Sequence, residues 1–221
     1  MYTNAKASSS LEERAVVPLF PLPGAVFLPH TLLPLHVFEQ RYRDLIEDVH
    51  QDDGLLAIPR LKPGWEANYG GNPPLFRVAG FGKIVRCQVL PDGRSNIVIL
   101  GLGRIRIEDE LATDTAYRIS TGDVQADIFP TGGINAVRMD VDRLRMMVAQ
   151  TLGRRPQIAE RIGHLIAEQN DPVAFINGVA HLVLPDVDAR QRFLEMDHVR
   201  ERIELLEDLL ASALLDDGRS Q

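Results

Sequence analysis

The chain has 221 residues, of which 45% are hydrophobic, and its 24 Lys and Arg against 31 Asp and Glu give a net charge of −7. This acidic balance disfavours general binding to nucleic acid or to an anionic membrane, because both recruit proteins through positive charge. The single cysteine, Cys87, excludes an internal disulfide, which is typical of proteins from a reducing compartment.

The beginning of the chain lacks the apolar stretch of a signal peptide, and we expect residues 1–14 to form a flexible tail. No run of about 20 apolar residues predicts a membrane span. The sequence therefore indicates a cytoplasmic protein that does not associate with a membrane.

The pattern of the sequence changes near residue 130, where Pro130, Gly132 and Gly133 interrupt regular structure. Residues 15–129 contain short apolar runs, alternating patterns and many prolines, which predict a β-rich subdomain. Residues 134–215 repeat apolar residues at helical spacing, which predicts a helical bundle subdomain. The fold class that follows is α+β, with the strands first and the helices after them.

The β-rich part begins with a proline-rich segment, which predicts strands at a sheet edge because proline removes a donor from the hydrogen-bond ladder. We expect an edge strand over 15–22 and a second short strand over 31–38. A helix should follow over 38–50. Its apolar stripe, with spacings of three and four, consists of Phe38, Tyr42, Leu45, Ile46 and Val49.

A short strand and a long loop come next. Residues 54–59 form an apolar run that predicts a buried strand. Residues 60–74 predict a loop that holds the single tryptophan, Trp65, together with Tyr69. Long loops of this kind are often functional.

A series of strands completes the β-rich part. Residues 81–90 and 95–102 flank the sequence Pro-Asp-Gly-Arg, whose Asp-Gly pair suits a tight hairpin. Residues 103–111 alternate arginine with isoleucine, and residues 117–128 form the last expected strand. Several short strands in a row predict a small closed or strongly curved sheet.

The helical part should contain five helices. Asp171 and Pro172 mark the start of one of them, as a cap and a first-turn proline. The expected helices are the stripe from Ile134 to Leu152, residues 157–167, the helix after Asp171, residues 187–195 and the stripe from Val199 to Leu214. We expect the last helix to dock in its own bundle, which favours a monomer.

Catalytic patterns are not found in this sequence. It contains no phosphate-binding loop, no dinucleotide fingerprint, no GxSxG elbow and no histidine or cysteine spacing typical of a metal site. Cys87 lies in an alternating strand and is expected to be a small core residue. We therefore predict no catalytic residue, no metal and no cofactor, with an enzyme of an unrecognised kind as an open alternative.

Three stretches resemble the amino-terminal, substrate-binding domain of Lon proteases. PLFPLPGAVFLPHTLLPLHVFEQRY (18–42) resembles the opening of that domain, and VLPDGRSNIVILGLGRIRI (89–107) resembles its hairpin and the strand after it. QRFLEMDHVRERIELLEDLL (191–210) is similar to its helical ending. The resemblance covers about residues 15 to 212.

The resemblance implies a PUA-like β pseudo-barrel followed by a C-terminal α-helical bundle. It also implies binding of an unfolded polypeptide or of a specific protein partner. The chain stops at Gln221 with no ATPase motif and no protease domain, so it is similar to a stand-alone domain to which neither activity carries over.

A peptide-binding site is expected along the proline-rich segment and the long loop. Phe27 and Leu28, next to a turn, are predicted to be the most exposed residues of a shallow apolar groove. The candidate peptide-binding residues are Phe20, Leu22, Phe27, Leu28, Trp65 and Tyr69. The alternative, that these side chains pack the sheet against the first helix, is left open by the sequence.

RNA binding is the alternative function, because PUA-like folds often bind RNA. A local basic patch could form from Arg86, Arg94, Arg104 and Arg106. The acidic net charge argues against this function, so we expect nucleic acid not to be a partner.

Overall fold

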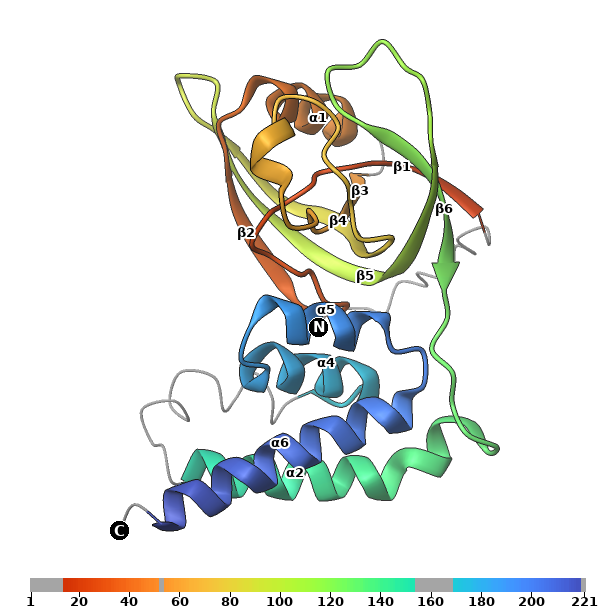
Figure 1. Cartoon of the computed structure of the whole chain (residues 1–221), viewed down its shortest axis with the longest axis vertical. Helices are drawn as coiled ribbons and strands as arrows, with labels where there is room; N and C mark the ends of the chain where they lie inside the picture. Colours follow the sequence, from red (N-terminus) through yellow and green to blue (C-terminus); the bar gives the residue numbers. More distant parts are fainter. Residues whose placement is uncertain (1–13, 52–53, 154–168, 220–221) are drawn as a thin grey trace, which may run out of the picture.

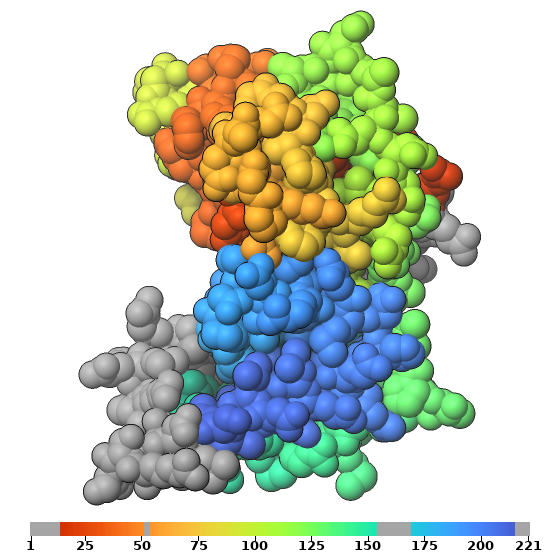
Figure 2. Space-filling model, viewed as in Figure 1, coloured from red at the N-terminus to blue at the C-terminus, as the bar shows by residue number. Residues whose placement is uncertain are grey.

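The computed structural model describes residues 14–51, 54–153 and 169–219. A β-rich part and a helical part are stacked along the long axis of the molecule (Figure 1). The space-filling view shows the two parts in contact across a broad boundary (Figure 2). The fold is therefore mixed α+β, as the sequence predicts.

Within the ranges that the structure describes, six strands form one antiparallel sheet. They are β1 (Arg14–Pro18), β2 (Leu32–Val37), β3 (Leu55–Ile58), β4 (Val78–Val89), β5 (Ser95–Glu110) and β6 (Ile119–Gln125). The strand order is β1-β6-β5-β4-β3, and β2 also pairs with β5. Two isolated parallel bridges, Leu19 with Ala57 and Leu22 with Arg60, connect the segment after β1 to β3 and the residues that follow it.

Strand β5 organises the sheet because it is continuous where two strands, 95–102 and 103–111, were expected. Its first half pairs with β2 and its second half with β6, while β4 runs along its other edge. The register between β4 and β5 shifts twice: Leu102 is an extra residue of β5 opposite the step from Phe81 to Gly82, and Val85 is an extra residue of β4 between Ile84 and Arg86. The predicted tight hairpin joins β4 to β5, with Gly93 at φ 81°.

Helix α1 (Gln40–Gln51) packs its apolar face onto the sheet. The predicted stripe is buried at Tyr42, Leu45, Ile46 and Val49. The prediction for Phe38 is wrong, because this residue precedes the helix and is 62% exposed.

The prediction that Phe27 and Leu28 are exposed is also wrong, since they are 1% and 0% exposed. The segment that carries them crosses two glycines of the sheet at backbone contact. A Cβ atom on Gly80 would lie 1.9 Å from the Phe27 carbonyl oxygen, and one on Gly101 would lie 2.5 Å from that of Leu28. Glycine is needed at these positions because only a missing side chain lets the segment approach so closely.

The helical part contains a short 3-10 helix and four α-helices in the described ranges. They are η2 (Gly133–Val137), α2 (Arg138–Gly153), α4 (Pro172–Val183), α5 (Val187–Glu195) and α6 (Val199–Arg219). The predicted start at Asp171 is confirmed, since its side chain accepts a hydrogen bond of 2.9 Å from the Ala174 N–H. The helix expected over 157–167 lies outside the described residues.

One apolar core joins the helices, and α5 lies next to the sheet (Figure 1). Leu144 of α2, Val179 of α4 and Leu206 of α6 are all fully buried in it. Ile134, which was expected in the apolar stripe from Ile134 to Leu152, is exposed instead. Within the described ranges, no helix is both long and apolar enough to cross a membrane.

Candidate functional site

The loop between β3 and β4 is fixed to the body of the protein at its base. The Lys62 N–H donates a hydrogen bond of 2.8 Å to the Pro74 carbonyl, which closes the loop. Arg118, the residue before β6, donates a hydrogen bond of 2.9 Å through Nη1 to the Pro73 carbonyl. Figure 2 shows this segment spread over one face of the β-rich part. The loop is therefore held in a defined conformation on the surface.

Four aromatic rings and one arginine form a stack that runs from the core to this loop. The rings of Phe20 and Tyr42 are parallel, with centroids 4.2 Å apart. The Arg41 guanidinium lies 4.7 Å from the ring centroids of both Tyr42 and Tyr69. Trp65, in the 3-10 helix η1 (Trp65–Asn68), meets Tyr69 edge to face at 5.2 Å. We call these five residues the aromatic stack.

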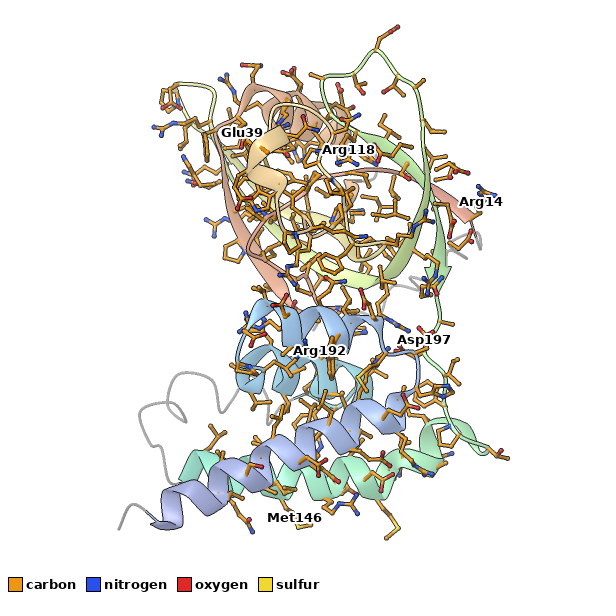
Figure 3. The ribbon with its side chains drawn as sticks, viewed as in Figure 1. Arg14, Glu39, Arg118, Met146, Arg192 and Asp197 are labelled. Carbon is orange, nitrogen blue, oxygen red and sulfur yellow. The ribbon has the colours of Figure 1, made fainter. Side chains whose placement is uncertain are left out.

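Glu39 holds the outer part of the aromatic stack in place. Its carboxylate accepts hydrogen bonds from Arg41 Nε at 3.1 Å and Nη2 at 2.9 Å, and it also accepts one from the Tyr69 hydroxyl. Figure 3 places Glu39 near η1 in the β-rich part. Because the charges of Glu39 and Arg41 neutralise each other, the stack presents a surface with little net charge.

The two tyrosines of the stack stay protonated at physiological pH. Burial raises the pKa of Tyr42 to about 12, although the nearby Arg41 charge opposes the shift. Burial and then the hydrogen bond to Glu39 raise the pKa of Tyr69 above its ordinary value. Tyr69 therefore acts as a stable hydrogen-bond donor to Glu39.

The structure brings together some of the predicted peptide-binding residues. Phe20, Trp65 and Tyr69 belong to the aromatic stack, and Leu22 packs against the same core cluster as Phe20. The loop aromatics Trp65 and Tyr69 are partly exposed, whereas Phe20 is buried. Phe27 and Leu28 lie under the sheet glycines and do not reach this surface.

The sequence interpretation did not assign a site role to Glu39, Arg41 or Tyr42. Their signal is the run Glu-Gln-Arg-Tyr at the start of α1, which places a carboxylate, a cation and a ring within four positions. Alternation and helical spacing alone identify only Tyr42, as a core residue. A stacking role depends on a loop more than twenty positions away, so local patterns do not reveal it.

The predicted basic patch is not formed as expected, because Arg104 is buried, with 2% of its side chain exposed. Arg104 Nη1 donates hydrogen bonds to the carbonyls of Leu194 at 3.1 Å and Met196 at 3.0 Å, and to Asp197 at 2.9 Å. Nη2 donates to the Asp127 carboxylate at 3.1 Å. These bonds join β5 to the turn between α5 and α6, where Figure 3 shows Asp197.

Arg202 of α6 completes this junction. It donates through Nη2 to Asp127 at 2.7 Å and through Nε to the Met196 carbonyl at 2.8 Å. We call Arg104, Arg202, Asp127 and Asp197 the arginine clamp. Two cations around Asp127 make the clamp an ionic joint between sheet and helices rather than a site for nucleic acid.

The other predicted arginines do not converge on one patch. Arg94 forms an ion pair with Asp92 at 2.6 Å in the hairpin turn, so its charge is neutralised locally. Arg86 is exposed on β4, and Arg106 is partly exposed on β5. The prediction of an exposed patch that includes Arg104 is therefore wrong.

A groove of about 380 Å³ separates α1 from the β4–β5 hairpin, with Arg43 and Asp44 on one wall and Cys87 and Val89 on the other. Cys87 packs against the core cluster under α1, as predicted, but it is partly exposed to this groove. Burial raises the pKa of its thiol, which disfavours the reactive thiolate. Among the residues that the structure describes, no three metal-ligating side chains converge.

This arrangement of sheet and helices occurs in known proteins. Residues 16–212 match the family model of the ATP-dependent protease La (LON) substrate-binding domain. The chain is 25% identical over 199 residues to the Lon protease of Cytophaga hutchinsonii, with 89% of this chain and 24% of that protein covered. It is 26% identical over 206 residues to the Lon protease of Escherichia coli, with 91% and 25% covered. The chain thus spans about a quarter of the length of these relatives.

The fold is similar to that of the N-terminal domain of the Mycobacterium avium complex Lon protease. The TM-score is 0.69 at 18% sequence identity, and the match covers 89% of this chain and 98% of the other. At this identity the likeness shows the fold alone. The family match over most of the sequence goes further, and the chain belongs to the Lon substrate-binding domain family.

Proposed function

We propose that the protein is a non-catalytic module that binds polypeptide, either an unfolded chain or a specific protein partner. The observation that carries the proposal is the aromatic stack, whose outer rings Trp65 and Tyr69 are partly exposed and held from behind by Arg41. Membership of the Lon substrate-binding domain family supports it. In this proposal the sheet is a PUA-like pseudo-barrel, which the bridges Leu19–Ala57 and Leu22–Arg60 support.

The aromatic stack suits polypeptide binding for an energetic reason. Tryptophan and tyrosine are common anchors at protein interfaces because they bury a large area through few rotatable bonds. Trp65 and Tyr69 already contact each other in the free protein, so little side-chain entropy is lost when a ligand covers them. The nearly neutral Glu39–Arg41 pair accommodates ligands of varied sequence.

The experiment measures the binding of a labelled, reduced and alkylated polypeptide and of its folded counterpart by fluorescence anisotropy. We expect saturable binding of the unfolded polypeptide alone. Replacement Trp65→Ala should weaken it about tenfold, the effect of removing an interface anchor. The matched control is Met139→Ala, which removes an exposed apolar side chain from α2 and should leave the affinity unchanged.

Two outcomes would contradict the proposal. The first is the absence of saturable binding to any unfolded polypeptide. The second is binding of structured RNA alone, lost steeply as the salt concentration rises, which is the behaviour of a phosphate-binding surface. Equal affinities of Trp65→Ala and wild type would remove the aromatic stack from the binding site.

A further inference from the structure

A second surface lies on the outer side of β2, β5 and β4. The side chains of Ile97 and Ile99 point into the core, so their neighbours along β5 point outward. We call the outward residues the β2 face. They are Leu32, Pro34, His36 and Phe38 from β2 and the residue after it, Asn96, Val98, Leu100 and Leu102 from β5, and Lys83, Val85, Arg86 and Gln88 from β4.

The register of the strands aligns apolar residues beside cations. Leu32 lies opposite Leu100, which lies opposite Lys83 on the other side of β5. In the next row Pro34 pairs with Val98, and Val98 pairs with Arg86. These two rows therefore run from an apolar residue on β2, over an apolar residue on β5, to a positive charge on β4, whereas the third row, His36, Asn96 and Gln88, is polar.

The β2 face exposes more apolar surface than packing requires. Leu32 is 58% exposed, Phe38 is 62% exposed, and Val85, which the bulge in β4 turns outward, is 52% exposed. Phe38 lies at the other end of β2 from Leu32, but Leu32 is contiguous with the partly exposed Leu100 and Val98. A contiguous exposed apolar surface of this kind is typical of an interaction site. The structure describes no other segment of the chain that covers them.

The charges of the β2 face select the chemistry of the partner. None of its outward positions is Asp or Glu, although the chain carries a net charge of −7. Lys83 and Arg86 form no ion pair with any described residue, whereas Arg94 in the nearby turn is paired with Asp92. Two unpaired cations beside an apolar strip are complementary to carboxylates that flank apolar side chains.

The face of the sheet, rather than the free edge of β2, is the docking surface. The Gly101 N–H donates to the Thr31 carbonyl at 2.9 Å, so the even-numbered residues of β2 direct their backbone groups away from β5. Pro34 occupies the middle of that free edge and has no N–H to donate. The proline interrupts strand addition at the edge, a common protection of exposed strands.

We propose that the β2 face binds a polypeptide segment that carries apolar side chains together with Asp or Glu. The apolar side chains cover Leu32, Val98 and Leu100, and the carboxylates pair with Lys83 and Arg86. This inference rests on the proposed function and specifies its ligand. The aromatic stack, with its neutralised Glu39–Arg41 pair, supplies no such charge preference, while the β2 face does.

The test uses two labelled peptides that are identical except that every Glu of the first is Gln in the second. Fluorescence anisotropy measures their affinities for the whole chain over a series of salt concentrations. We expect the Glu peptide to bind more tightly, with an advantage that falls as salt rises. Lys83→Glu combined with Arg86→Glu should weaken the Glu peptide about tenfold, because each exposed ion pair contributes up to roughly fivefold in affinity. The Gln peptide should change less than twofold.

The matched control reverses the same number of charges elsewhere. Arg138 and Arg192 are exposed and form no ion pair with a described residue, and Figure 3 shows Arg192 in the helical part. Arg138→Glu combined with Arg192→Glu should leave both affinities unchanged. A further variant, Leu32→Ser, should weaken both peptides alike, since it removes apolar contact without a change in charge.

The failures of the two proposals are distinguishable. If neither peptide nor the unfolded polypeptide binds the wild type, polypeptide binding fails and this inference fails with it. A second outcome refutes only the β2 face. In it the unfolded polypeptide binds, the two peptides bind equally, and Lys83→Glu combined with Arg86→Glu leaves both affinities unchanged, as the control variant does. If Lys83→Glu combined with Arg86→Glu abolishes binding of structured RNA but not of the Glu peptide, the β2 face is a nucleic-acid surface and the inference is overturned.

Discussion

Removal of Arg104 should uncouple the sheet from the helices. The guanidinium donates to the carbonyls of Leu194, Met196 and Ala126 and to the carboxylates of Asp197 and Asp127. Arg104→Met keeps much of the side-chain volume but removes the donor to Leu194, Ala126 and Asp197. Arg202 still donates to Asp127 and to the Met196 carbonyl. Loss of one member of a buried ion pair costs about 3–5 kcal/mol. Because both carboxylates are partly exposed to water, we expect the lower end, about 3 kcal/mol.

Urea unfolding gives a direct assay of this prediction. With a slope of about 2–3 kcal/mol per molar urea for a chain of this size, the midpoint should fall by about 1 M. Trp65 is the single tryptophan and lies in the β-rich part, so its fluorescence reports on the sheet, while circular dichroism reports mainly on the helices. In Arg104→Met the two transitions should separate.

The control for this experiment is Arg106→Met on the same strand. Arg106 is partly exposed and makes no ion pair with a described residue, so its replacement should change stability by less than about 0.5 kcal/mol. The reasoning about the arginine clamp would be refuted if Arg104→Met unfolded at the wild-type midpoint with coincident transitions.

Three further predictions concern stability. The folded state keeps the Tyr42 proton up to about pH 12, whereas the unfolded chain loses it near pH 10, so the free energy of unfolding should fall by about 2 kcal/mol as pH rises through this window. Urea unfolding of Tyr42→Phe should lack that part of the decline. An identical decline in the variant would contradict the assignment. Gly101→Ala should cost about 1–3 kcal/mol by thermal unfolding, because the new Cβ meets the Leu28 carbonyl, whereas Gly178→Ala, with open space around it, should raise the melting temperature. Asp171→Ala removes the cap of α4 and should cost about 1 kcal/mol in the same assay, and an unchanged melting temperature would argue against the cap.

Local patterns predicted the elements whose cause is local. The hairpin depends on Asp92 and Gly93 themselves, and the start of α4 depends on Asp171 and Pro172, so neighbouring residues are sufficient to identify both. The length of β5 was missed because its glycine-rich centre looks like a strand end. In the fold the strand continues through this centre, since Leu102 forms a bulge in β5 while Gly101 and Gly103 stay paired with β4.

The errors at the candidate site have distant causes. Burial of Phe27 depends on Gly80, more than fifty positions away, because the absence of a side chain there lets the backbone of the proline-rich segment approach the sheet. Arg104 alternates with isoleucine as a surface residue does, yet the turn after α5 covers it. Trp65 was identified from its loop, but its place in the aromatic stack depends on Arg41, which only the tertiary structure brings beside Tyr69.

The pairing of β1 with β6 sets an order for folding during synthesis. Pro18 pairs with Ile119, so the first strand emerges from the ribosome long before its partner exists. At about 5–20 residues per second, β1 waits roughly 5–20 s for β6 to be made. During that time Val17, which ends in the core, has no partner strand to cover it. The nascent chain is thus exposed to chaperones and to aggregation until β6 appears, and a slower passage through residues 20–119 would lengthen that exposure.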